Sequence, residues 1–222
     1  MIKFITIPLL TIVVLTGALK LWDNQIDSQQ DSPIIEDIAY LSTEYIEVPE
    51  VETKEKLAPE KILLNVPLLL QRPTLPTGCE IVSTTMMLDY MGIDVDPVKL
   101  AEEIPYDKND PSLGYVGNPF TDGGWTIYPE AMIETIMKYL PTAKVMTGVS
   151  MDELKEQLAL EKPVVVWLSG MHGYTIHSVI VTGYDMKGIY YNDPWSGEKN
   201  AWISNDDFLT MWSDQEYRAL SY

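Results

Sequence analysis

The 222-residue sequence has one cysteine, two histidines and few basic residues. A single cysteine excludes an internal disulfide, so the chain encodes no disulfide framework. Fifteen lysines and arginines against 33 acidic residues give a net charge of −18, and no basic cluster offsets it. This charge repels a phosphate backbone. Nucleic acid is therefore excluded as an expected partner.

A metal site is not expected either. The only histidines, His172 and His177, are five residues apart, which puts them on opposite faces of a strand and out of register on a helix. Cys79 is the only thiol, and no recognised spacing of metal ligands is present. We expect no metal ion and no other cofactor.

The residues that are present predict one globular domain behind an N-terminal extension. Hydrophobic residues make up 46% of the chain and aromatic residues 10%, which suits a buried core in residues 61–222. Residues 23–60 hold eleven acidic residues, two lysines and no glycine, so we predict an acidic linker or stalk there. A short helix packed on the domain is the alternative for part of that range.

The remaining segment, residues 1–22, indicates export. Between Lys3 and Lys20 the chain carries no charge, over a length between that of a signal-peptide core and that of a membrane span. Cleavage after Ala18 and retention as a membrane anchor both remain open. In either case we expect an extracytoplasmic domain, secreted or tethered to the outer face of the cell membrane.

Within residues 61–222 the pattern predicts helices first and a sheet second. Apolar residues at three- and four-residue steps favour a helix from Cys79 to Met91, which Gly92 ends. A short extended segment is expected at residues 64–70. Three further helices carry start signals, namely Asp96 with Pro97, Pro129, and a capping box of Ser150 and Glu153.

The last third of the chain predicts a sheet. Residues 163–168, 176–184 and 188–192 are rich in Val, Ile and Tyr, and a tight turn at 185–188 joins the last two into an antiparallel hairpin. Further strands are expected at 199–203 and 217–221, separated by a short helix from Asp206 with Ser204 as its cap. Helices followed by an antiparallel sheet give the α+β fold class.

Cys79 is a candidate nucleophile because it begins the first predicted helix. The positive end of the helix dipole and the unpaired N–H groups there are expected to lower the pKa of a thiol. A thiol nucleophile needs a base, and His177, at the start of a predicted central strand, has a defined side-chain direction. His172 lies in a loop with glycines on both sides, which predicts a poorly fixed side chain, and is kept as a reserve.

Two further residues complete the predicted site. A hairpin that turns at residues 185–188 brings Asp193 back beside His177, where its carboxylate can orient the imidazole. Asn192 is the competing partner and points to the opposite face. Gln71, on the loop that leads to Cys79, is a candidate amide donor for an oxyanion. An ordinary structural role is the alternative for each residue taken singly.

Several motifs in this chain together resemble a known family. They are Leu75-Pro76-Thr77-Gly78-Cys79-Glu80 with Gln71 before it, the later run Gly114-Tyr115-Val116-Gly117-Asn118-Pro119-Phe120-Thr121, His177-Ser178-Val179 and Asn192-Asp193-Pro194. Their order resembles the bacteriocin-processing (double-glycine) peptidase-like branch of the papain-fold cysteine peptidases, over residues 62–222.

The resemblance implies a papain-like cysteine peptidase fold and a peptide or protein substrate. It also implies roles for four residues: Cys79 as nucleophile, His177 as general base and acid, Asp193 as the residue that orients it, and Gln71 as oxyanion donor. The same four residues follow from the spacing argument above.

The leading hypothesis is an extracytoplasmic cysteine peptidase that hydrolyses peptide bonds through an acyl-enzyme intermediate. The stretch 114–125 is rich in glycine and aromatic residues and is expected to line a cleft, with Gly117, Asn118, Trp125 and Trp195 as candidate substrate-binding residues. Another thiol acyl-transfer enzyme, either a cell-wall peptide amidase or a transpeptidase, is the first alternative. A catalytically silent peptide-binding module is the second. The sequence predicts no oligomeric state.

Overall fold

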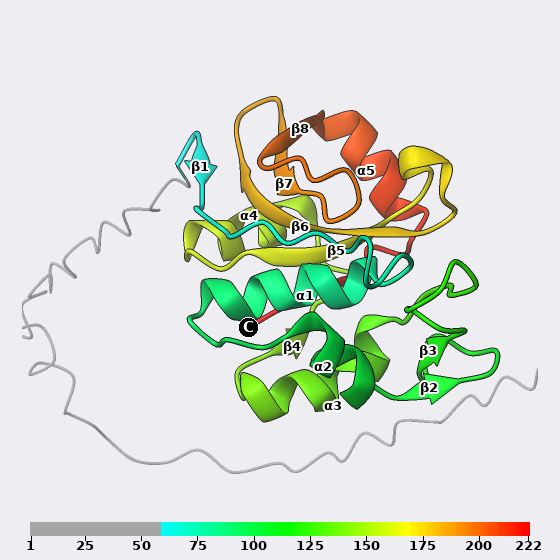
Figure 1. Ribbon diagram of the computed structural model, residues 1–222. Helices are drawn as coiled ribbons and strands as arrows, with labels where there is room; N and C mark the ends of the chain where they lie inside the picture. Colours follow the sequence, from blue (N-terminus) through cyan, green and yellow to red (C-terminus); the bar gives the residue numbers. More distant parts are fainter. Residues whose placement is uncertain (1–58) are drawn as a thin grey trace, which may run out of the picture. The chain divides into compact units, whose positions relative to one another are not determined.

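The computed structural model describes residues 59–222, so the expectations for residues 1–22 and for nearly all of 23–60 lie outside the described residues. This part of the chain forms a mixed fold of five α-helices and a large antiparallel sheet (Figure 1). The predicted α+β class is therefore confirmed. None of its helices is long and apolar enough to cross a membrane.

The main sheet has the strand order β4-β9-β5-β6-β7-β8, and every pairing in it is antiparallel. Its central strands come from the predicted hairpin region, where the turn forms through the bond from Asp185 N–H to the Gly188 carbonyl, 2.9 Å long. The bounds are β4 Lys144–Val145, β5 Val164–Leu168, β6 His177–Tyr184, β7 Gly188–Asn192, β8 Ala201–Ser204 and β9 Ala219–Ser221.

The expected extended segment at residues 64–70 is not assigned as a strand. The strand here is β1, Ile62–Leu63, which pairs with Gly183 and Tyr184 beyond the part of β6 that faces β5. After one more bond, from Leu64 N–H to the Thr182 carbonyl, the chain leaves the sheet. Pro67 has no N–H to continue the pairing.

Local capping signals position the helices correctly. The Asp96 side chain accepts a hydrogen bond from Val98 N–H at the start of α2, Pro97–Glu103. Ser150 and Glu153 form the complete capping box of α4, Met151–Ala159. The other helices are α1 Cys79–Tyr90, α3 Pro129–Tyr139 and α5 Asn205–Ser213, the last capped by Ser204.

Helix α1 is the buried centre of the fold. Its first ten residues are all buried, and it lies between the sheet and the α2–α3 layer, while α5 covers the other side of the sheet (Figure 1). The Ser83 hydroxyl donates to the Ser178 carbonyl of β6 over 3.1 Å, which ties the helix to the central strand. Helix α1 is therefore packed against the strand that carries His177.

A second, two-stranded sheet lies in the long connection between α2 and α3. Its strands β2, Tyr106–Asp107, and β3, Tyr115–Val116, are parallel. The buried Tyr115 donates its hydroxyl to the Thr77 carbonyl over 2.5 Å. This bond fastens the connection to the segment that leads into α1.

Candidate active site

Cys79 is the first residue of α1, and its side chain reaches a cleft while remaining 6% exposed. Burial, together with the neighbouring Glu80 carboxylate, raises the pKa of the Cys79 thiol well above its usual value. The expectation that the helix N-terminus lowers this pKa is therefore wrong for the protein at rest. Loss of solvation outweighs the dipole, so forming a thiolate requires a partner that takes the proton.

Glu80 is fully buried beside this thiol. One carboxyl oxygen accepts a hydrogen bond from the Thr126 hydroxyl, and the other has no partner among the described residues. Burial raises the pKa of the Glu80 carboxyl to about 7. A buried acid that titrates near neutrality thus lies next to the candidate nucleophile.

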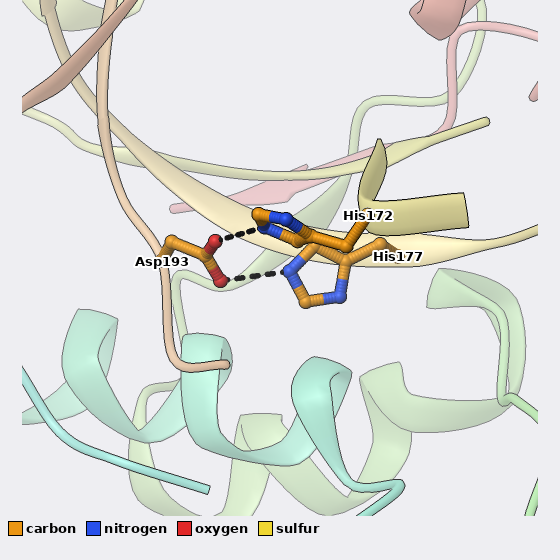
Figure 2. Close-up of side chains that lie close together, drawn as sticks. All are labelled: His172, His177 and Asp193. Atoms are coloured by element: carbon orange, nitrogen blue, oxygen red, sulfur yellow. Dashed lines mark hydrogen bonds and ion pairs between the residues drawn. The ribbon is translucent and has the colours of Figure 1, made fainter. Parts of the chain in front are cut away.

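His177 and Asp193 are joined directly, as Figure 2 shows. The distance from His177 Nε2 to Asp193 Oδ1 is 2.8 Å, and both side chains are buried. A bulge between Val181 and Gly183 shifts the hairpin register, and continuing the pairing past β7 would put Asp193 opposite Val179 rather than His177. The Asp193 side chain still reaches His177, although the two residues are offset by two positions in the strand register.

The protonation of the pair follows from the carboxylate. Burial raises the pKa of Asp193, but the hydrogen bond and charge of His177 outweigh it, and the net pKa lies well below the usual range. An ionised carboxylate only accepts hydrogen bonds, so Nε2 of His177 carries the hydrogen. In the neutral imidazole, Nδ1 is then an open acceptor, directed away from Asp193 (Figure 2). That is the form a general base requires.

His172 contacts the other oxygen of the same carboxylate. Its Nε2 lies 2.6 Å from Asp193 Oδ2, and its ring stacks on Trp195 with the ring centres 4.5 Å apart. The expectation that glycines leave this side chain poorly placed is wrong, because the turn Met171–Gly173 holds the ring against Asp193 and Trp195.

The same geometry corrects the argument against a metal site. Because His172 lies on this turn and not on β6, the five-residue spacing does not separate the two imidazoles, and ligand atoms of His172, His177 and Asp193 lie within 4.8 Å of one another. These are residue types that bind transition metals. The carboxylate oxygens, however, already accept hydrogen bonds from both imidazoles, so the cluster is satisfied by hydrogen bonds alone.

Gln71 lines the cleft together with Cys79 and His177. Its side-chain nitrogen donates to the Pro76 carbonyl over 2.7 Å, which holds the loop that leads into α1. An amide nitrogen has two hydrogens, so the second remains for a ligand oxygen. Asn192, the competing partner for His177, instead donates to the carbonyls of Val66 and Pro67.

A cleft of about 120 Å³ lies over these residues, too small to enclose a typical small-molecule ligand but able to take one side chain of a longer peptide. Its walls include Trp125, Tyr174 and Trp195. Gly117 and Asn118 are not among the lining residues. Gly117, at φ +90°, packs on Gly123, and the Asn118 side chain caps the loop by accepting from Phe120 N–H.

The comparisons with known proteins agree with this arrangement. Residues 63–220 match the Peptidase_C39-like family, which is well over half of the chain. The chain belongs to this family. The family resemblance stated from the motifs is confirmed, and with it the papain-type fold.

Relatives of this C39-like chain support the assignment. A Bacillus anthracis protein whose crystal structure is described as that of a candidate C39-like peptidase is 31% identical, with a TM-score of 0.70 over 74% of this chain and 98% of its own. The uncharacterised protein YvpB of Bacillus subtilis is 29% identical over 178 residues, 68% of this chain and 71% of YvpB. A prointerpain A fragment from Prevotella intermedia, at 12% identity and a TM-score of 0.50 over 74% of this chain and 72% of the fragment, shares the fold.

The sequence argument gave Glu80 no role and kept His172 only as a reserve base. Glu80 could have been recognised, because it is the only charged residue in the first ten of a helix that is otherwise apolar or small and polar. His172 carried no such signal, since its approach to Asp193 depends on the path of a loop.

Proposed function

We propose that this C39-like protein is a cysteine peptidase that hydrolyses peptide bonds through an acyl-enzyme intermediate on Cys79. One observation carries the proposal: Cys79 and His177 border the same cleft, and the Asp193 carboxylate fixes His177 Nε2 while its Nδ1 remains an acceptor. Nucleophile, base and orienting group are the three components of thiol-dependent acyl transfer.

The residues support a balanced sequence of steps. His177 Nδ1 takes the thiol proton, and the sulfur of Cys79 bonds to the substrate carbonyl carbon, whose oxygen becomes negative. The second amide hydrogen of Gln71 and the backbone N–H of Cys79, at the unpaired start of α1, are the donors for that oxygen. The C–N bond then breaks, and the amine leaves with the proton from the imidazolium.

The second half of the reaction returns the site to its first state. His177 Nδ1 takes a proton from water, the hydroxide oxygen bonds to the thioester carbon, and the C–S bond breaks. The sulfur recovers a proton, and the product is a carboxylic acid. Since burial raises the pKa of Cys79, the proton is best transferred when substrate is present to receive the negative charge.

We also propose that this activity lies outside the cytoplasm, in a protein that is secreted or held at the outer face of the membrane. The uncharged stretch between Lys3 and Lys20 supports the proposal, and a peptide or protein is the substrate class that fits the aromatic cleft. Protease accessibility of the full-length chain in intact cells tests the location. Complete protection in intact cells, lost on lysis, would place the domain inside.

The function is tested with the full-length chain and its Cys79→Ala and His177→Ala variants. We expect the wild type to cleave members of an unbiased peptide mixture, with new termini identified by mass spectrometry, and both variants to lose at least about 10³-fold in rate. Because His177 takes the thiol proton, alkylation of Cys79 by iodoacetamide should be faster in the wild type than in His177→Ala at the same pH.

The outcomes separate the alternatives. Transfer of the acyl group to an added amine in preference to water would identify a transpeptidase. A folded wild type with ordinary thiol reactivity, and with no cleavage that Cys79→Ala abolishes, would reject catalysis and leave a peptide-binding module.

A further inference from the structure

The Asp193 carboxylate has an unusual pair of partners. His177 Nε2 approaches Oδ1 at 2.8 Å and His172 Nε2 approaches Oδ2 at 2.6 Å, so each oxygen has its own imidazole. Figure 2 shows the two neighbouring rings on one side of the carboxylate, each facing one of its oxygens. Because an ionised carboxylate can only accept, both imidazoles donate from Nε2.

The two oxygens are not equally supported. Oδ1 accepts a second hydrogen bond from the Trp195 backbone N–H, 2.9 Å away, whereas His172 is the only donor to Oδ2 among the described residues. Asp193 is buried, and His172, whose side chain is 26% exposed, lies between Oδ2 and solvent. Without His172, the charged Oδ2 would lose its only donor among the described residues, and one of the three hydrogen bonds that orient the carboxylate would be gone.

His172 is itself held in an uncommon conformation. Its backbone φ is +54°, in the left-handed region that a non-glycine residue rarely occupies, and its ring is stacked on Trp195. Strained backbone of this kind persists where surrounding contacts determine it, and it is frequent at functional sites. The contacts that hold this ring are the Asp193 carboxylate and the Trp195 indole.

We propose that His172 is a positioning residue of the catalytic site, which holds the Asp193 carboxylate so that Oδ1 stays directed at His177. The effect of His172 on catalysis rests on the proposed peptidase function. Its hydrogen bond to Asp193 does not, because that bond exists without substrate. His172 does not border the cleft and acts through Asp193 and His177.

Two substitutions separate the hydrogen bond from the stacking. His172→Phe keeps an aromatic ring for Trp195 but has no donor, while His172→Gln keeps an N–H donor of similar reach and cannot titrate. Both place a non-glycine side chain at the same positive φ, so backbone strain is matched. We expect His172→Phe to lower kcat about tenfold with little change in KM, and to slow Cys79 alkylation at pH 6 by a similar factor. His172→Gln should restore both rates.

A second measurement needs no substrate, and its first part uses only the wild type. Because the full-length chain has only two histidines, ¹⁵N-histidine labelling yields two sets of imidazole resonances. In the wild type, both residues should show a hydrogen-bonded Nε2–H proton protected from solvent exchange. In folded His172→Phe, the remaining proton of His177 should exchange faster.

The two measurements test the positioning role of His172 and the peptidase function separately. An unprotected His172 proton in the wild type, or a His172→Phe variant with wild-type alkylation and unchanged His177 exchange, would overturn the positioning role. A wild type in which both protons are protected but Cys79 is inert would support the placement of His172 and reject the peptidase function.

Discussion

The Thr126 hydroxyl donates a hydrogen bond to the Glu80 carboxyl, which joins the residue after Cys79 to a loop residue 46 positions later. Both residues are fully buried, and Glu80 has no cationic partner among the described residues. A carboxyl in that environment is most stable when it is neutral. A carboxyl whose protonation changes with pH therefore lies in the core directly after the candidate nucleophile Cys79.

This link predicts how stability depends on pH. The pKa of Glu80 is raised from 4.5 to about 7 on folding, so the folded protein binds more protons than the unfolded chain between these values. The free energy of unfolding should then decrease as the pH rises from about 4.5 to about 7, by about 3 kcal/mol from this group. Urea denaturation from pH 5 to 8 should show a flatter dependence in Glu80→Gln than in the wild type.

The control is Glu156→Gln, which removes an exposed glutamate on α4. It should retain the wild-type slope, and equal slopes in all three proteins would show that Glu80 is already ionised in the fold. An independent consequence concerns the thiol: because the Glu80 carboxylate raises the pKa of Cys79, that pKa should be lower in Glu80→Gln.

Asn192 predicts an effect on stability instead of chemistry. Its buried amide donates to the carbonyls of Val66 and Pro67, and its oxygen accepts from Asn200 N–H, so one side chain connects the segment before α1 to the end of the sheet. Asn192→Leu leaves these buried groups unpaired. We expect a loss of about 2–4 kcal/mol in the free energy of unfolding by urea titration.

Tyr190→Phe is the matched control on the same strand, since the Tyr190 hydroxyl donates to the more accessible Asp185. Tyr190→Phe should lower the free energy of unfolding by less than about 1 kcal/mol. Equal losses in the two variants would argue against the connecting role of Asn192.

The elements that were predictable from the sequence are those fixed by local signals. The caps Asp96 and Ser150 and the turn at residues 185–188 each satisfy backbone groups within a few residues, so their outcome depends little on the rest of the fold. The pairing of His177 with Asp193 was also accessible, because a tight hairpin relates the two residues through one turn.

Other features depend on contacts distant in sequence. The position of β1 is set by the edge of β6, and the pKa of Cys79 by burial in a helix enclosed on all sides. The approach of His172 to Asp193 requires a loop with several left-handed residues, a path that hydrophobic periodicity does not encode. Sequence patterns therefore singled out the candidate nucleophile and the candidate base that border one cleft, but not the electrostatics around them.

Gln71 provides a test of oxyanion stabilisation. If its second amide hydrogen binds the transition-state oxygen, Gln71→Ala should lower kcat about 10²-fold with a much smaller change in KM. The bond to the Pro76 carbonyl is also lost in this variant, so a distorted loop must be distinguished from a missing donor. Alkylation of Cys79 needs no oxyanion donor and should keep its wild-type pH profile. A slower alkylation would indicate that the loop had moved.

Trp125 offers the clearest test of where substrate lies. It borders the cleft, is 46% exposed, and has no side-chain hydrogen bond in the described part of the chain, so its indole is available to cover an apolar side chain of a peptide. Losing such a contact removes binding that substrate and transition state share. Trp125→Ala should therefore raise KM roughly tenfold while kcat stays nearly constant.

Trp202 on β8 is the control, since this tryptophan is 48% exposed and does not line the cleft. Trp202→Ala should leave both kinetic constants near the wild-type values, and steady-state kinetics on one cleaved peptide suffices for the comparison. If both variants had the same KM as the wild type, substrate would have to lie on the Trp195 side of the cleft. If Trp125→Ala lowered kcat alone, the indole would support the catalytic residues instead of binding peptide, because only an interaction specific to the transition state changes kcat without KM.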